Sequence, residues 1–284
     1  MHNRRILYVN TILAVCGLIS CVAINGRVSA SPSLSENGTS GPSFIKASIE
    51  RNYVKSLSGE RARIASRRWQ IAIDGARNAN RPIPILESIV ARHTALLVVD
   101  MQRAFLDVGA AIEVPEGRAI VPNINKLAVA IRDKGGQVVF FRYLVNEQVG
   151  LLRYFERKSY LGAKRESPMN ALRAGHPQFE FYPELDVRKT DTVMDKIRYS
   201  AVLGSGIVEF LKKHGIQNVI VTGVTTDVCA GNTAEDLMQK DFNVVMVWDG
   251  TAALNRLEHE LYLARIFGLY GDVMPTEEVI ARLK

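Results

Sequence analysis

Continuous apolar runs that alternate with helical segments constrain most strongly what this chain can fold into. The runs are TALLVVD (94–100), QVVFFRY (137–143), NVIVTGV (218–224) and NVVMVWDG (243–250), with a shorter strand expected at 191–196. A strand that is apolar at nearly every position is buried on both faces, as in a parallel sheet. Helices are expected over residues 116–134, 201–214, 229–241, 256–268 and 276–284. This alternation predicts an α/β fold: a three-layer, doubly wound, mostly parallel sheet with helices on both faces.

The first thirty residues have the pattern of a signal peptide. A basic start (MHNRR) precedes a long apolar run, and the small residues Val28 and Ala30 then mark a cleavage site. We therefore expect an exported protein, periplasmic or secreted, without stable membrane insertion after processing. A retained anchor is the weaker alternative, because Asn10 and Thr11 interrupt a short span. A second alternative is a lipoprotein, since LISC (18–21) resembles a lipobox that would lipidate Cys21.

Composition separates residues 31–90 from the rest of the chain. Residues 31–43 form a polar linker rich in Ser, Gly and Pro, and an arginine-rich, partly helical extension follows it up to residue 90. Residues 91–284 are then expected to form one domain. The net charge is +7, of which three charges lie before residue 31. Because basic and acidic residues are interleaved, we expect no nucleic-acid partner.

The cysteines are distributed unevenly along the chain. Cys16 and Cys21 lie in the predicted signal peptide, which leaves Cys229 as the sole cysteine of the mature protein. A single thiol cannot form an internal disulfide, so Cys229 is either an inert core residue or a free, reactive thiol.

Three chemically active side chains follow predicted strands. Asp100 follows the strand at 94, Lys196 ends the strand at 191, and Cys229 comes shortly after the strand at 218. Taken singly, such residues are more often turn, surface or core residues. In doubly wound sheets, however, ligands bind beyond the carboxyl ends of the strands. A carboxylate, an ammonium and a thiol at that edge predict a reactive site.

The segments ALLVVDMQRAFL, DTVMDKIRYSAV and VIVTGVTTDVCAGNTAEDLMQKDFNVVMVWDGTAA carry a family resemblance. Together they resemble the isochorismatase-like cysteine hydrolases, a superfamily that contains nicotinamidases, N-carbamoylsarcosine amidases and ureidoacrylate amidohydrolases. The resemblance covers residues 94–284. It implies a catalytic triad of Asp100, Lys196 and Cys229, in which Cys229 is the nucleophile.

The resemblance also implies how these groups act. Asp100 would take the thiol proton and later pass it to the leaving amine, and Lys196 would hold both groups by its charge. A helix that starts at Cys229 favours the thiolate, so we expect iodoacetamide to label this residue below neutral pH. A cis peptide bond between Val224 and Thr225 would direct the Thr225 N–H, with the Cys229 N–H, toward an oxyanion. The alternative is an ordinary strand-to-helix turn.

Substrate-binding residues are predicted from position alone. Gln102 and Phe105 follow Asp100 closely, and Tyr143 ends the second strand; Phe105 fits core packing equally well. Residues 151–185 are interpreted as a lid or an oligomer contact, and we expect a homo-oligomer. Arginines 142, 153 and 157 could pair with a substrate carboxylate, although solvated positions are favoured for them.

No metal and no cofactor are expected. Metal-binding nicotinamidases carry a histidine-rich motif after the second strand, whereas residues 140–150 here contain no histidine, and His176 and His214 stand alone. The resulting hypothesis is an amidohydrolase that cleaves a C–N bond of a small amide, ureide or carbamoyl compound. One alternative is an isochorismatase-type vinyl ether hydrolase, although such members commonly lack the cysteine. A non-catalytic binding or thiol-sensing protein is the other, although it would need no complete triad.

Overall fold

The computed structural model describes residues 86–110, 112–146 and 168–284. The predicted signal peptide with Cys21, the linker and nearly all of the N-terminal extension lie outside the described residues. So does part of the predicted lid, including positions 153 and 157.

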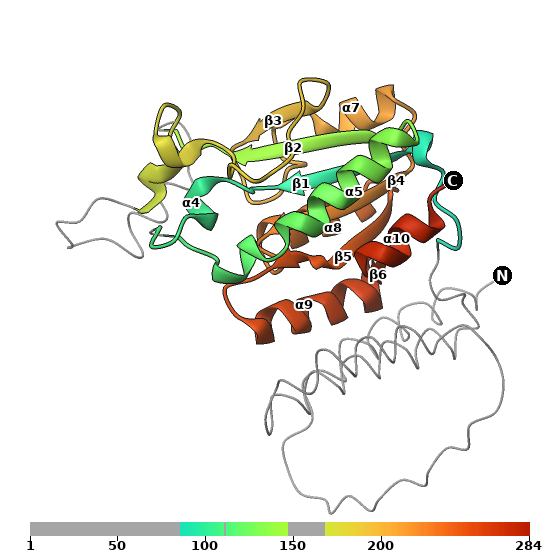
Figure 1. The fold of residues 1–284 in the computed structure, drawn as a ribbon. Coiled ribbons are helices and arrows are strands. Elements are labelled where there is room, and N and C mark those ends of the chain that lie inside the picture. The colour runs from blue at the N-terminus through green and yellow to red at the C-terminus, as the bar shows by residue number, and fades with distance from the viewer. Residues whose placement is uncertain (1–85, 111, 147–167) are drawn as a thin grey trace, which may run out of the picture. The chain divides into compact units, whose positions relative to one another are not determined.

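The described residues contain a six-stranded sheet in which every pair of neighbours is parallel. Its strands are β1 (Thr94–Val99), β2 (Gln137–Tyr143), β3 (Thr192–Lys196), β4 (Asn218–Val224), β5 (Asn243–Ala252) and β6 (Asp272–Met274). The strand order is β3-β2-β1-β4-β5-β6. From β1 the chain adds β2 and then β3 on one side. It then crosses to β4, on the other side of β1, and adds β5 and β6 beyond it (Figure 1). The point where the direction reverses, between β1 and β4, is where doubly wound sheets bind ligands.

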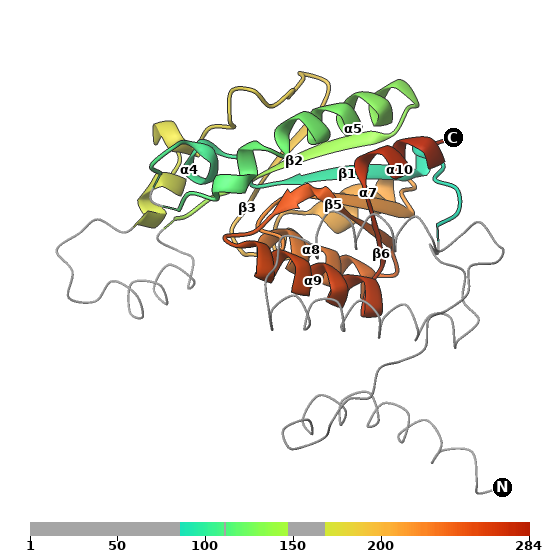
Figure 2. The same cartoon turned by 60° about the horizontal axis from the view of Figure 1, so that its bottom comes forward.

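Helices cover both faces of the sheet (Figure 2). One face carries α5 (Val121–Asp133) and α10 (Thr276–Arg282). The other carries α7 (Ile207–Lys213), α8 (Cys229–Met238) and α9 (Arg256–Leu269). Strand β1 shows why both layers are needed: Leu96 and Val98 pack toward α5, while Leu97 and Val99 pack toward the other helices. The predicted three-layer, doubly wound fold is confirmed.

Short helical segments complete the description, and two predicted helices begin later than expected. The short segments are η2 (Ala91–His93), α4 (Arg103–Leu106), η3 (Pro115–Arg118), η4 (Pro168–Leu172) and η5 (Pro177–Phe179). The helix expected from residue 201 starts at Ile207, because Gly204 and Gly206 have φ angles of 85° and 80°, outside the helical region. The helix expected from residue 116 starts at Val121, after the 3-10 turn of η3.

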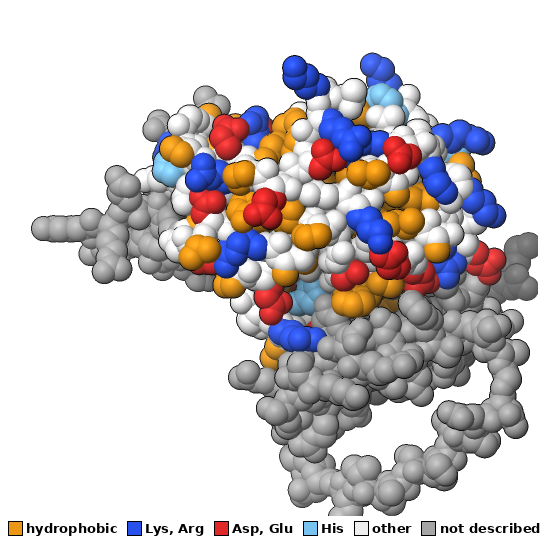
Figure 3. All heavy atoms as spheres, viewed as in Figure 1, with side chains coloured by type: hydrophobic (Ala, Val, Ile, Leu, Met, Phe, Trp, Pro, Cys, Tyr) orange, Lys and Arg blue, Asp and Glu red, His pale blue; other side chains and the backbone are white. Residues whose placement is uncertain are grey.

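The face of the molecule in Figure 3 carries basic and acidic side chains in close alternation, with small hydrophobic areas between them. Within the described residues, no helix has both the length and the apolar character that crossing a bilayer requires.

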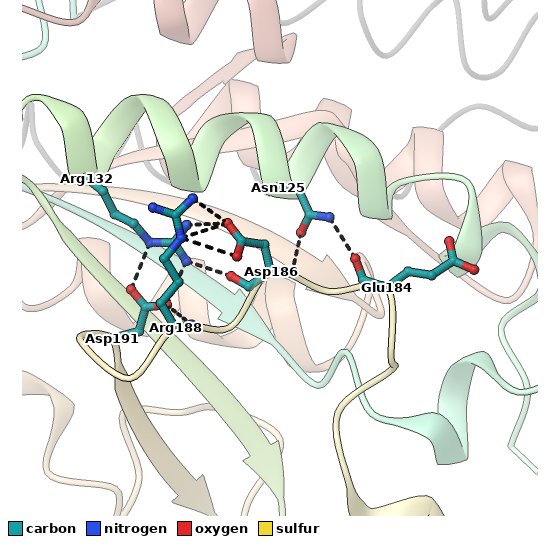
Figure 4. Close-up of polar contacts among 6 residues, drawn as sticks. All are labelled: Asn125, Arg132, Glu184, Asp186, Arg188 and Asp191. Atoms are coloured by element: carbon teal, nitrogen blue, oxygen red, sulfur yellow. Dashed lines mark hydrogen bonds and ion pairs between the residues drawn. The ribbon is translucent and has the colours of Figure 1, made fainter.

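A cluster of ion pairs holds the loop that leads into β3 (Figure 4). Arg132, in the last turn of α5, lies 2.6 Å from the carboxylate of Asp191 and 2.8 Å from that of Asp186. In addition, the Asn125 side chain donates to the carbonyl of Glu184 and accepts from the Asp186 N–H. Because β3 is an edge strand with a single neighbour, these contacts replace the support that a second neighbour would give.

We expect Arg132→Met to destabilise the fold by about 3 kcal/mol, because it leaves Asp191 buried without its partner. The Asp191 side chain is 3% exposed and the Arg132 side chain 11% exposed. Arg188→Met is the matched control: Arg188 pairs with the same Asp186 but is 45% exposed, so its loss should cost less than about 1 kcal/mol. Urea unfolding of the variants measures both values. Equal losses would show that burial of the Arg132 pair is energetically unimportant.

Candidate functional site

Asp100 and Lys196 form a buried ion pair at the carboxyl edge of the sheet. The Lys196 Nζ lies 2.8 Å from Oδ2 of Asp100, and both side chains are fully buried. Asp100 directly follows β1 and Lys196 ends β3, and strand β2 lies between these two strands. Tyr143, the last residue of β2, is in register with Lys196. The ammonium also donates to the Arg198 carbonyl at 3.0 Å and lies 4.2 Å from the centre of the Tyr143 ring. The buried charge is therefore compensated on several sides.

The end of β1 is shaped by an unusual backbone conformation at Asp100. Its φ angle is 54°, in the left-handed region that few residues other than glycine adopt and that aspartate tolerates better than most. Its N–H still donates to the Phe141 carbonyl at 3.1 Å. Its carboxylate is held by the ion pair with Lys196.

Cys229 completes the cluster from the other side of β1. It is the first residue of α8, its thiol is free, and the residue is 5% exposed. The thiol interacts with both the Asp100 carboxylate and the Lys196 ammonium. The structure thus brings the three residues singled out from the sequence into one site at the topological switch point.

Burial controls the protonation of this site. It is the largest cause of the raised pKa of Cys229 and of the raised pKa of Asp100, while Lys196 lowers both. The Asp100 charge raises the pKa of Cys229 further. The expectation of a thiol ionised below neutral pH is therefore wrong, because desolvation outweighs the helix N-terminus and the lysine. Burial thus favours the protonated form of the Cys229 thiol.

The turn between β4 and α8 contains a cis peptide bond between Val224 and Thr225. The Thr225 carbonyl accepts from the N–H groups of Val228 and Ala230, at 3.2 and 3.1 Å. The turn and cap hydrogen bonds found in the described residues use neither the Thr225 N–H nor the Cys229 N–H. Both groups therefore remain available as donors.

Glycine is required just before this turn. Gly223 has a φ angle of 101°, and a Cβ atom there would lie 2.0 Å from the carbonyl oxygen of Val99. No other residue fits between β4 and β1 at this level, so Gly223 sets how closely the two central strands approach each other below the site.

The three residues predicted to bind substrate have different environments. The Gln102 side chain is fully buried and forms hydrogen bonds with the main chain. It accepts from the Tyr143 N–H and donates to the Phe179 carbonyl. The Gln102 amide ties the segment around Phe179 to the end of β2, and a substrate-binding role for this residue stays a prediction. Phe105 belongs to the hydrophobic cluster beneath α5, the alternative weighed for it.

Tyr143 does reach the site. It is 3% exposed, its ring lies against the Lys196 ammonium, and burial, with smaller contributions from the charges of Cys229 and Asp100, raises its pKa. Arg142, in contrast, pairs with Asp195 at 2.8 Å and stacks over Phe179, which gives its guanidinium partners within the protein.

Sequence reasoning missed two side-chain hydrogen bonds around Cys229. Thr233, one turn after Cys229, donates to the Cys229 carbonyl at 2.7 Å and accepts from the Ala201 N–H at 3.0 Å. It thereby joins α8 to the loop that follows Lys196. On the opposite side, Thr226 contacts His259 of α9. The four-residue spacing of Thr233 from Cys229 on one helix is a signal that the sequence does contain. The contact with α9 depends on packing between distant segments.

No group of three His, Cys, Asp or Glu side chains in the described ranges is arranged to hold a metal ion.

Comparison with known proteins places this fold and site in a family. The model of the isochorismatase domain matches residues 94–278. The ureidoacrylate amidohydrolase of Acinetobacter baylyi is 28% identical over 207 residues, which is 68% of this chain and 84% of the relative. The cysteine hydrolase of Pseudomonas syringae pv. phaseolicola 1448A superposes with a TM-score of 0.60 at 25% identity, covering 69% of this chain and 94% of that one.

A third relative is the probable inactive nicotinamidase of Arabidopsis thaliana, which is 30% identical over 57% of this chain and 82% of the relative. The chain belongs to the isochorismatase family, whose members are hydrolases, amidohydrolases among them.

Proposed function

We propose that this protein is a cysteine amidohydrolase that cleaves a C–N bond of a small amide, ureide or carbamoyl compound. The observation that carries the proposal is the convergence of Asp100, Lys196 and Cys229 in one buried site of a hydrolase-family fold. Each of the three supplies what amide hydrolysis needs: a base, a fixed positive charge and a nucleophile.

The reaction would proceed in two halves. As the Cys229 sulfur attacks the substrate carbonyl, its proton passes to Asp100, and the carbonyl oxygen becomes an oxyanion bound by the N–H groups of Thr225 and Cys229. Asp100 then gives that proton to the leaving nitrogen, which departs as ammonia or an amine and leaves a thioester. In the second half, Asp100 takes a proton from water as it attacks the thioester, and returns it to the sulfur.

The raised pKa of Asp100 suits this exchange, because a carboxylate of ordinary acidity would be a weak acceptor for a thiol proton. Lys196 keeps the total charge of the site balanced while the negative charge moves from Asp100 to sulfur and on to the oxyanion. A fixed ammonium that need not reorganise during the reaction stabilises each of these anions.

The relatives leave a non-catalytic alternative open. The Acinetobacter baylyi relative is a ureidoacrylate amidohydrolase and supports amide chemistry, whereas the relative in Arabidopsis thaliana is named as probably inactive. In this chain the nucleophile, base and lysine are all present and within reach of one another, which favours the enzyme.

An ammonia-release assay on the purified full chain tests the proposal. Ureidoacrylate, N-carbamoylsarcosine and nicotinamide represent ureide, carbamoyl and aromatic amide substrates, and we expect ammonia from at least one of them. Isochorismate is included as the vinyl ether probe. Pyruvate from isochorismate without ammonia from any amide would replace the proposal with ether hydrolysis. Absence of both products, with Cys229 intact, would favour a binding protein.

A further inference from the structure

Thr226 lies inside the turn that the proposed mechanism uses, yet it has no part in the chemistry described so far. It follows Thr225, the second residue of the cis peptide bond, and is fully buried. Its N–H donates to the Ala252 carbonyl at the end of β5, at 2.8 Å. Its hydroxyl lies 2.6 Å from Nδ1 of His259. The turn is thereby attached both to β5 and to α9.

His259 is the buried, neutral partner in this pair. The residue is 3% exposed in the first turn of α9, and burial lowers the pKa of the ring to about 3. The ring also hydrogen-bonds to the main chain of Trp248, a contact that acts against this lowering and therefore uses a ring N–H. The Thr226 hydroxyl can both donate and accept, so it pairs with Nδ1 in either tautomer of the ring.

Charged groups near the ring do not replace this contact. Arg256, one turn earlier on α9, lowers the pKa of His259 by its charge, but its guanidinium is engaged with Glu260 at 3.0 Å. The hydrogen bond between Thr226 and His259 is a short, buried bond between neutral groups, and such bonds fix geometry tightly because neither partner has water as an alternative.

The turn transmits the position of Thr226 to the proposed oxyanion donors. The Thr225 carbonyl is held by the N–H groups of Val228 and Ala230, so the backbone from Thr225 to Ala230 forms one closed loop. Thr226 is the point of this loop that is anchored to β5 and α9. A shift at Thr226 therefore reorients its neighbour Thr225.

We propose that Thr226 and His259 are positioning residues, which hold the Thr225 N–H in the direction that stabilises the oxyanion. The inference rests on the proposed function, since it concerns the same reaction. Neither residue touches substrate. Their loss should slow the chemical step without changing substrate affinity or the attack of the thiol on reagents that form no oxyanion.

The test compares Thr226→Val, which keeps the shape but removes the hydroxyl, with Thr94→Val. Thr94 is also fully buried and donates to a main-chain carbonyl, that of Val90, but it begins β1 at the opposite edge of the sheet. Turnover is measured with 4-nitrophenyl acetate, an activated acyl donor, and with the best amide of the ammonia assay. Thr226→Val should lower kcat by about tenfold or more with KM nearly unchanged, and Thr94→Val should leave both near the wild-type values.

Three further readouts separate positioning from a general structural effect. Thr226→Ser, which keeps the hydroxyl, should restore most of kcat. His259→Leu should lower kcat as Thr226→Val does, and the double variant should lose little more, because both remove one interaction. Alkylation of Cys229 by iodoacetamide, which forms no oxyanion, should proceed at the wild-type rate in Thr226→Val.

Wild-type kcat in Thr226→Val, additive losses in the double variant, or a parallel loss of alkylation would each overturn the inference. If Thr226→Val does not fold, Thr226→Ala replaces it with the same expected outcomes. A wild-type chain that turns over neither probe would contradict the proposed function itself, which keeps the two failures distinct.

Discussion

Replacing Cys229 by alanine should abolish turnover, with kcat reduced by about 10⁴-fold or more, because no other group in the site can form the covalent intermediate. The fold should remain, since the change removes a single buried sulfur atom at a cost of about 1 kcal/mol. Ammonia release measures the first expectation and thermal unfolding the second. The matched control is the double change Cys16→Ala and Cys21→Ala, which removes two thiols from the predicted signal peptide and should leave turnover unchanged.

Purified Cys229→Ala with activity within about tenfold of wild type would end the nucleophile assignment, because residual catalysis by binding and oxyanion donors alone is far smaller than that. In the wild-type protein, alkylation of Cys229 should be slow at neutral pH and should accelerate as the pH rises. This direction follows from burial, which raises the pKa of the thiol.

The sequence was sufficient to predict the sheet and the residues that meet at its edge. Strands β1 and β4 are buried at every position and β2 and β5 at most positions, as expected for a parallel sheet that helices cover on both faces. Once the strands are placed, Asp100, Lys196 and Cys229 fall at their carboxyl ends. Strand β6 was not predicted, because a strand of three residues leaves no period in the sequence.

The pKa shifts of the site residues and the hydrogen bonds around them could not be predicted in the same way. The sequence shows that Cys229 starts a helix, but the degree of burial, which decides the direction of its pKa shift, depends on packing from segments far along the chain. Gln102 is a similar case. Its position close to Asp100 suggested that it lines a substrate pocket. In the structure its amide donates to the Phe179 carbonyl, which lies in a segment without regular periodicity.

Lys196→Met should raise the pKa of Cys229 further and lower kcat by about 100-fold or more, because it removes the positive charge that pairs with Asp100. The sign follows from the charges: the Lys196 ammonium lowers the pKa of the thiol, and the Asp100 carboxylate raises it. Without the lysine, formation of a thiolate beside an unpaired carboxylate is opposed by both burial and repulsion. Each unit of pKa shift corresponds to about 1.4 kcal/mol.

The alkylation rate of Cys229 as a function of pH reports this titration separately from turnover. We expect the curve of Lys196→Met to lie at higher pH than that of the wild type. Lys126→Met is the matched control, because Lys126 pairs with Glu277 on the surface, where it is 53% exposed, and should leave the curve in place.

Folding needs its own control, since Lys196→Met leaves Asp100 as a buried carboxylate without a partner, a loss that costs about 3–5 kcal/mol in other proteins. If this variant does not fold, the double change Asp100→Asn and Lys196→Met removes both charges and should fold. Its thiol remains buried, so its alkylation should still require high pH, and turnover should be absent because the base is gone. Superimposable alkylation curves for Lys196→Met and the wild type would show that the thiolate does not depend on Lys196. The charge balance on which the proposed mechanism rests would then be wrong.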